Sequence, residues 1–208
     1  MSRILFLVSH LASGSTGLVH ILNGNERIQM MTSNIIYENV NDLNILKTQR
    51  HKLNNVAAIY GDHLLFNTSL NNKSLYNCAK FIFCIRPGAA TINELVSKHD
   101  VAPESALNYY CFRLRRIYEM AYQMPQAVLV TWDDLASGKE LRQIEEYLDL
   151  NTPLCPNPEL FEGKIEDIAP FPIRQQAEDY YEKYFYLFNC LNTTDSPQKF
   201  SCFSTDKS

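Results

Sequence analysis

Short apolar runs alternate with amphipathic stretches along most of the chain. Residues 4–8 are a continuous run of Ile, Leu, Phe, Leu and Val, which is typical of a strand buried on both faces of a parallel sheet. Similar runs at residues 56–60, 81–85 and 127–131 predict three further strands. The order of strands and helices predicts an α/β fold, a three-layer sandwich in which a mainly parallel sheet lies between helices.

Four segments place apolar residues at the three- and four-residue steps of a helix. They are residues 18–22, which Gly24 ends, a long helix from Pro103 to residue 121, a helix from about 141, and a last helix at 174–188.

Local details of these helices also carry predictions. Arg113, Arg115 and Arg116 share a face of the long helix that is expected to be solvated. Ser137 and Glu140 match a capping box before the third helix, and the tyrosines of the last helix are expected in the core or lining a groove.

The remaining segments set the expected domain organisation. Residues 28–55 are rich in Asn and weakly periodic, so short helices and loops are expected there. No repeat or linker interrupts the pattern. Residues 1–190 are therefore predicted to form one domain, and residues 191–208 a loose polar tail.

Composition narrows the class of protein. The 208 residues are 46% hydrophobic with a net charge of −4, which excludes general disorder and argues against a nonspecific nucleic-acid binder. No apolar run approaches the ~20 residues that cross a bilayer, and no secretory signal pattern is present, so a cytoplasmic protein is expected. Six scattered cysteines without a C-x-x-C pair predict neither a disulfide framework nor a zinc site.

A loop of small and hydroxyl-bearing residues, 9–17, joins the first strand to the first helix. Backbone N–H groups converge at such a helix N-terminus, and the helix dipole favours an anion there. We therefore expect Ser13, Gly14, Ser15 and Thr16 to wrap a phosphate. The Lys of the pattern G-x-x-x-x-G-K-[ST] is absent, which disfavours ATPase, GTPase and kinase chemistry.

Two further candidates follow predicted strands. Arg86 comes directly after residues 81–85, and ligands of open α/β sheets bind beyond the carboxyl ends of strands. His63 follows residues 56–60, and an imidazole with its usual pKa of about 6.5 suits a general base. Simpler interpretations remain open, because Arg86 can pair with a carboxylate and His63 can lie on the surface. His10 can cap or pack.

Taken in order, these segments resemble the sulfotransferase family, which transfers a sulfuryl group from 3′-phosphoadenosine 5′-phosphosulfate (PAPS). Residues 12–16, Ala-Ser-Gly-Ser-Thr, are similar to the family motif that binds the 5′-phosphosulfate. Arg86 matches the arginine of the motif for the 3′-phosphate, with Asn93 near the position of the serine of that motif, and residues 62–64 resemble the stretch with the catalytic histidine. Residues 130–135 resemble an aromatic-acidic-Asp-Leu segment of the family.

The resemblance, which runs from about residue 3 to 167, implies a function and a site. It implies His63 as the catalytic base, a PAPS donor, the product 3′,5′-ADP (PAP) and no metal. The acceptor is an unidentified hydroxyl or amine of a small molecule, glycan or peptide, with contacts expected in residues 28–55. The residues implied to bind the nucleotide are Ala12, Ser13, Gly14, Ser15, Thr16, Gly17, Arg86, Asn93 and Lys164.

Three departures from the family pattern keep a second hypothesis open. Ala12 stands where the family has Lys or Arg, Asn93 lies near the position of a Ser, and Phe161 and Glu162 stand where two basic residues precede a glycine. Transfer of a charged group depends on charge stabilisation, so a missing cation matters. The alternative is a noncatalytic nucleotide- or partner-binding module on the same fold.

Overall fold

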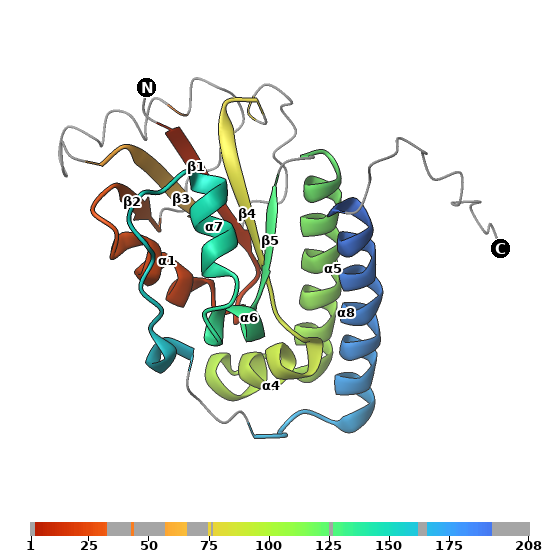
Figure 1. The fold of residues 1–208 in the computed structure, drawn as a ribbon. Coiled ribbons are helices and arrows are strands. Elements are labelled where there is room, and N and C mark those ends of the chain that lie inside the picture. The colour runs from red at the N-terminus through yellow and green to blue at the C-terminus, as the bar shows by residue number, and fades with distance from the viewer. Residues whose placement is uncertain are drawn as a thin grey trace.

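A five-stranded parallel sheet forms the centre of the described part of the chain (Figure 1). The computed structural model describes residues 3–32, 43, 57–65, 75, 77–124, 127–161 and 166–192. The spatial order is β2-β3-β1-β4-β5. The strands are β1 (Arg3–Ser9), β2 (Ile28–Met31), β3 (Ile59–Leu64), β4 (Ala79–Ile85) and β5 (Val128–Thr131).

Helices cover both faces of this sheet, so the predicted three-layer α/β sandwich is confirmed (Figure 1). One face carries α1 (Ser15–Asn23), α6 (Trp132–Ala136), α7 (Leu141–Leu148) and the 3₁₀ turn η2 (Pro158–Phe161). The other face carries α4 (Gly88–His99), α5 (Pro103–Tyr122) and α8 (Phe171–Asn192). None of the described helices combines the length and the apolarity that a membrane span needs.

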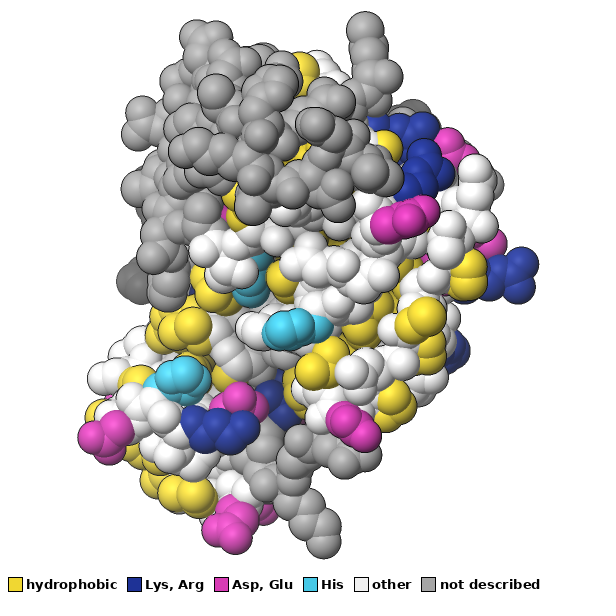
Figure 2. Space-filling model, turned by 90° about the vertical axis from the view of Figure 1, so that its left-hand side faces the viewer, with side chains coloured by type: hydrophobic (Ala, Val, Ile, Leu, Met, Phe, Trp, Pro, Cys, Tyr) yellow, Lys and Arg dark blue, Asp and Glu magenta, His cyan; other side chains and the backbone are white. Residues whose placement is uncertain are grey.

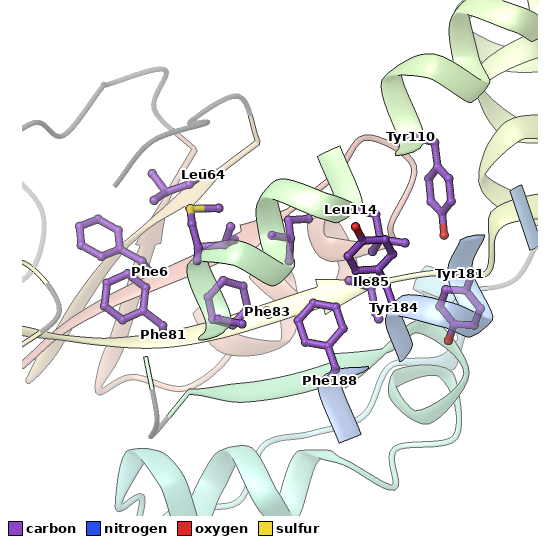
Figure 3. Close-up of a cluster of buried hydrophobic side chains, with 14 of the residues drawn as sticks. Phe6, Leu64, Phe81, Phe83, Ile85, Tyr110, Leu114, Tyr181, Tyr184 and Phe188 are labelled. Atoms are coloured by element: carbon purple, nitrogen blue, oxygen red, sulfur yellow. The ribbon is translucent and has the colours of Figure 1, made fainter. Parts of the chain in front are cut away.

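The alternation of side chains along β1 builds both cores. Leu5 and Leu7 point into the layer of α1 and α7, whereas Phe6 and Val8 point into the layer of α5 and α8. The second layer is rich in aromatic rings, as Figure 3 shows for Phe6 and its neighbours. A strand buried on both faces needs apolar residues at every position, which explains the unbroken run of residues 4–8.

The strand order reverses beside β1. From β1 the chain crosses to β2 on one side, and after β3 it returns past β1 to β4 on the other side. The loop after β1 and the turn after β4 therefore leave the sheet in opposite directions and open a crevice between them. Ligands of doubly wound sheets bind at such a reversal.

Two of the predicted boundaries were wrong. Residues 28–31, expected in loops or short helices, form the edge strand β2, and residues 33–42 and 44–56 lie outside the described residues. The strand expected at 56–60 runs instead from Ile59 to Leu64. Polar Asp62 and His63 can remain in a buried strand because their side chains hydrogen-bond inside the protein.

Helix details differ from the predictions in three places. Arg113 is 2% exposed rather than solvated. The predicted capping box is wrong: Thr131 caps α6 by accepting from the Asp134 N–H, and Ser137 ends that helix. The last helix is longer than predicted, from Phe171 to Asn192, because Pro172 is compatible with a first helical turn. The long helix from Pro103 and the strands near 81–85 and 127–131 are confirmed. The predicted tail, beyond residue 192, lies outside the described residues.

Candidate functional site: an anion loop at the sheet reversal

The loop after β1 has the backbone of an anion-binding turn. Ala12 (φ 59°) and Gly14 (φ 81°) are both in the left-handed region, and Gly14 is the N-cap of α1. Successive N–H groups in such a backbone face one concave side. A non-glycine residue held at positive φ is strained, and strain of this kind concentrates at ligand sites.

Gly14, the N-cap of α1, makes no side-chain cap, and the first turn of the helix contains no acidic residue. Within the described residues, the backbone N–H groups of Ala12, Gly14 and Thr16 donate no hydrogen bond, whereas that of Ser13 donates to the His10 carbonyl. These free donors and the positive end of the helix dipole face the same pocket. Oxyanions satisfy this combination of donors.

Arg86 is the buried cation of this pocket. Its side chain, which begins just after β4, donates through Nη1 to the Ala12 carbonyl at 2.9 Å and pairs with Glu94 at 2.5 Å. The guanidinium lies over the Trp132 ring, 3.9 Å from its centre. Arg86 is only 4% exposed, yet its Nε finds no hydrogen-bond partner among the described residues. A buried guanidinium with an unsatisfied N–H group is a candidate binding group for an anion.

The pocket has a volume of about 270 Å³ and lies where the strand order reverses. Residues 10–17 form one wall, Arg86 and Trp132 a second, and Glu94, Lys98 and His99 from α4 a third. On the face shown in Figure 2, basic and acidic side chains lie next to one another in the coloured part of the surface. Attraction for an anion therefore comes from individual groups at the pocket, Arg86 above all.

His10 connects the two sides of the crevice. Its Nδ1 must donate to the Leu11 carbonyl at 2.8 Å, and its Nε2 accepts from the Arg86 backbone N–H at 3.2 Å. Both ring nitrogens are thus used by the neutral imidazole that carries its proton on Nδ1. His10 is a structural link, in agreement with the capping or packing role expected for it.

Helix α5 supports the same segments from behind. The Tyr109 hydroxyl accepts from the Leu11 N–H, and the Tyr110 hydroxyl donates to the Arg86 carbonyl, both at 2.9 Å. Arg113 donates to the carbonyls of Ser9 and Leu64, at the carboxyl ends of β1 and β3. One helix thus fixes three segments of the candidate site.

His63 lies in β3 and is connected to the anion loop through serine hydroxyls. Its Nε2 is 2.8 Å from the Oγ of Ser9, and that Oγ is 2.9 Å from the Oγ of Ser15, which lines the pocket. His63 itself is 2% exposed and is not among the lining residues. The structure thus brings His63 near the loop, one serine away from it.

Burial keeps both histidines neutral. Desolvation, with a smaller contribution from the Arg113 charge, lowers the pKa of His63 to about 4. Desolvation likewise lowers the pKa of His10 to about 4, against the opposing effect of its bond to the Leu11 carbonyl. A group with a depressed pKa stays unprotonated at neutral pH and accepts a proton less readily than a free imidazole.

The depressed pKa of His63 has a consequence for stability. Below pH 6.5 the histidine of the unfolded chain gains a proton that the folded protein binds only near pH 4. Protonation therefore stabilises the unfolded state, and the free energy of unfolding decreases as the pH falls. We expect the loss of unfolding free energy between pH 7 and pH 5.5 to be about 1 kcal/mol smaller in His63→Gln than in the wild type. Urea denaturation at both pH values measures it.

The comparison between variants is needed because Glu140 acts in the opposite direction. Desolvation raises its pKa to about 7, with a smaller contribution from a hydrogen bond to Asp134, so its contribution to stability grows as the pH falls. The exposed His20→Gln change is the matched control. Equal pH dependence in the wild type and His63→Gln contradicts a histidine held neutral by the fold.

The other residues expected at the site lie in different surroundings. Gly17 lines the pocket, and a Cβ there would lie 2.9 Å from the Phe161 ring. Asn93 is buried outside the lining; its amide donates to Asp167 and accepts from the Ala169 N–H. Lys164 lies outside the described residues. Among the described residues, no group of three or more His, Cys, Asp and Glu is placed to hold a metal ion.

Three contributors to the site were not identified from the sequence. Ser9 is the last residue of an apolar strand, and nothing in its neighbours signals a contact with His63. Glu94 follows Arg86 by eight residues, in the second turn of the next helix, and only the fold brings the two together. Trp132 belonged to a recognised segment, but its position over Arg86 depends on the adjacency of β4 and β5.

The fold and the site together define a parallel α/β sandwich with a pocket at its strand reversal, lined by free backbone N–H groups and by Arg86. No protein-family model matches the chain, and no curated protein matches its sequence. Chains of known structure do match. Mouse sulfotransferase SULT7A1, solved in complex with PAP, is 13% identical over 91% of this chain and 83% of that one, with a TM-score of 0.49. Retinol dehydratase, solved with androsterone and the inactive cofactor PAP, is 11% identical over 97% and 84%, with a TM-score of 0.44.

Proposed function

We propose that this protein is a PAPS-dependent sulfotransferase. The observation that carries the proposal is that the two segments that resemble the nucleotide-binding motifs of the sulfotransferase family lie at one pocket. Residues 12–16 and Arg86 are about seventy positions apart in the sequence, yet the Arg86 guanidinium hydrogen-bonds the Ala12 carbonyl beside the free N–H groups of the loop. Two separate anion-binding elements suit a nucleotide with phosphates at both its 5′ and 3′ positions.

In this proposal the loop from Ala12 to Gly17 holds the 5′-phosphosulfate, and Arg86 holds the 3′-phosphate. Asn93 supports the 3′-phosphate side by fixing Asp167 and Ala169 against α4. Lys164, outside the described residues, is the proposed second cation. The pocket of about 270 Å³ along residues 10–17 is consistent with the phosphosulfate end of the donor, since backbone N–H groups approach there without intervening side chains.

The proposed reaction is an in-line transfer with His63 as the base. The acceptor oxygen or nitrogen forms a bond to sulfur while the bond from sulfur to the oxygen of the 5′-phosphate breaks. The electron pair of that bond leaves with 3′,5′-ADP, and the proton of the acceptor passes to His63. Neutral His63 has a lone pair available at pH 7, and the N–H groups of the loop neutralise charge on the leaving phosphate.

Calorimetric titration with 3′,5′-ADP tests the nucleotide assignment. We expect micromolar binding of 3′,5′-ADP and at least tenfold weaker binding of AMP, because AMP lacks the 3′-phosphate that Arg86 would contact. ATP, which carries three phosphates at the 5′ position and none at the 3′ position, is the control for a site that recognises 5′-phosphates alone. Equal affinity for AMP and 3′,5′-ADP contradicts a 3′-phosphate site.

Ala12 favours a second candidate function, a noncatalytic nucleotide- or partner-binding module. A methyl group stands where the family has a cation, and among the described residues the basic side chains that line the pocket are His10, Arg86, Lys98 and His99. Such a module binds 3′,5′-ADP, or neither nucleotide, and transfers nothing.

Restoring the cation separates the two candidates. If the chain is an enzyme that lacks one part, Ala12→Lys is expected to increase release of 3′,5′-ADP from PAPS by about 10- to 100-fold, because a charge at the leaving oxygen stabilises the transition state. Release is measured by chromatography with a panel of hydroxyl and amine acceptors. Ala12→Gln, of similar length and no charge, is the control. No release from either variant or the wild type favours the binding module.

A further inference from the structure

A chain of hydrogen bonds connects the anion loop with the interior of the sheet. The Oγ atoms of Ser13 and Ser15 are 2.9 Å apart, those of Ser15 and Ser9 are 2.9 Å apart, and Ser9 Oγ is 2.8 Å from His63 Nε2. All four residues are 3% exposed or less. Since these residues are almost fully buried, most of their hydrogen bonds are made with one another, and Ser13 and Ser15 also border the pocket.

The direction in which each hydroxyl donates follows from counting protons. Each serine Oγ has one proton to donate and accepts up to two hydrogen bonds. Ser13 Oγ accepts from the Ser15 backbone N–H at 3.3 Å, so its own proton is free to go to Ser15 Oγ. The directions of the two remaining hydrogen bonds, Ser15–Ser9 and Ser9–His63, depend on Ser15, because its single proton goes either toward Ser9 or toward the pocket.

An anion in the loop removes that choice. An oxyanion only accepts hydrogen bonds, so Ser15, which lines the pocket, donates to it. Ser9 must then donate to Ser15, and its Oγ can only accept from His63. A histidine that donates through Nε2 carries its proton there, and its lone pair lies on Nδ1. With the loop empty, the opposite direction is also allowed, in which Ser9 donates to Nε2.

We propose that Ser15 and Ser9 transmit the occupancy of the anion loop to His63, so that a bound anion fixes the imidazole as its Nε2–H tautomer. This inference rests on the proposed anion-binding role of the loop. Arg113 donates to the Ser9 and Leu64 carbonyls beside the ring, and this neighbouring cation opposes an imidazolium. Binding of the anion by itself therefore moves the His63 proton between the two nitrogens and leaves the ring neutral until it takes the proton of the acceptor.

Ser9 and the Nδ1 atom of His63 thereby each have a defined role in the proposed reaction. Ser9 is a positioning residue, because it acts on the proposed reaction through His63 and does not line the pocket. The basic atom in the donor-bound state is Nδ1 of His63. The lone pair is thus fixed on Nδ1 once the donor has entered the loop, which orders donor binding before proton removal.

Nitrogen NMR of the ¹⁵N-histidine-labelled full chain at pH 7 tests the coupling. The protonated and the lone-pair nitrogens of a neutral imidazole resonate far apart, so the spectrum reports the tautomer directly. The spectrum of His63→Gln identifies the His63 signals. His10 is an internal reference, since its bonds to Leu11 and Arg86 hold it as the Nδ1–H form. We expect saturating 3′,5′-ADP to increase the Nε2–H fraction of His63 and to leave His10 unchanged.

Two serine variants show whether the signal travels by this path. Ser9→Ala removes the link between Ser15 and His63 and is expected to abolish the tautomer response while anion binding persists. Ser97→Ala removes an exposed hydroxyl of α4 that does not line the pocket, and is expected to keep the response. An unchanged response in Ser9→Ala, or no response in the wild type with anion bound, overturns the coupling.

A second probe separates this inference from the nucleotide assignment. Inorganic phosphate occupies the loop without needing a 3′-phosphate site. A tautomer shift with phosphate but no binding of 3′,5′-ADP keeps the coupling and rejects the PAPS proposal. Binding of 3′,5′-ADP without a shift rejects the coupling and keeps the proposal. Absence of binding by either probe at tens of millimolar rejects both.

Discussion

Arg86→Ala is expected to weaken 3′,5′-ADP binding by about 10- to 100-fold, the loss typical of one charge-assisted contact to a phosphate. Arg86 is a buried cation at the pocket, it contacts the loop at Ala12, and its Nε has no hydrogen-bond partner among the described residues. The variant also leaves Glu94 paired only with the exposed Lys98, which adds repulsion for an incoming phosphate. Calorimetric titration measures the loss, and a thermal melt verifies that the variant is folded.

Two control variants bracket this result. Arg115→Ala removes an exposed arginine from α5 and is expected to leave the affinity unchanged. Glu94→Gln removes the competing carboxylate and is expected to tighten 3′,5′-ADP binding by about 3- to 10-fold. Binding by Arg86→Ala at wild-type affinity contradicts the assignment of this arginine to the nucleotide, whatever the behaviour of Glu94→Gln.

Gly14→Ala is expected to lower the free energy of unfolding by roughly 2–4 kcal/mol, since overpacking and backbone strain add. A Cβ on Gly14 would lie 1.9 Å from Cε3 of Trp132, and the residue has φ 81°. The ring cannot stay where it is, so it must also leave the Arg86 guanidinium that it packs against. Urea denaturation measures the stability, and titration with 3′,5′-ADP is expected to show weaker binding.

Gly138→Ala is the matched control for backbone strain. Gly138 also has a positive φ of 71°, but the atom nearest to its added Cβ is Pro156 Cβ at 3.3 Å. We expect a loss of about 1 kcal/mol there, from strain alone. The difference between the two variants isolates the contact with Trp132. If Gly14→Ala is no worse than Gly138→Ala, the close contact between the loop and the ring is wrong.

Strands and long helices could be predicted where the pattern of apolar residues fits only one kind of secondary structure. The run at residues 4–8 is typical of a doubly buried strand, and the helix beginning at Pro103 repeated its apolar residues over about four turns. The strand β2 was missed because Ile28, Gln29, Met30 and Met31 form an edge, where alternate positions are half-exposed and the pattern is short. Edge strands carry the weakest apolar pattern in a sheet.

The residues of the binding loop and Arg86 could be predicted from sequence motifs, but the hydrogen bonds that connect the site to its surroundings could not. The glycine-rich loop and Arg86 could be recognised from residue types at the ends of strands, because the carboxyl ends of parallel strands share one edge. The buried position of Arg113 could not, since its neighbours Arg115 and Arg116 share its charge and only the helix phase separates them. The contact between Ser9 and His63 joins two strands whose adjacency no local pattern encodes.

The attachment of α5 to three chain segments has a consequence for motion. Tyr109, Tyr110 and Arg113 lie within five consecutive residues, yet their hydrogen bonds hold the loop after β1, the end of β3 and the turn after β4. Opening any one of these segments disturbs bonds that the same helical turn makes to the others. Local fluctuation is therefore suppressed, and the backbone amides of Leu11 and Arg86 should exchange with solvent mainly through unfolding of the whole layer. The rigidity of the crevice is a property of the helix behind it.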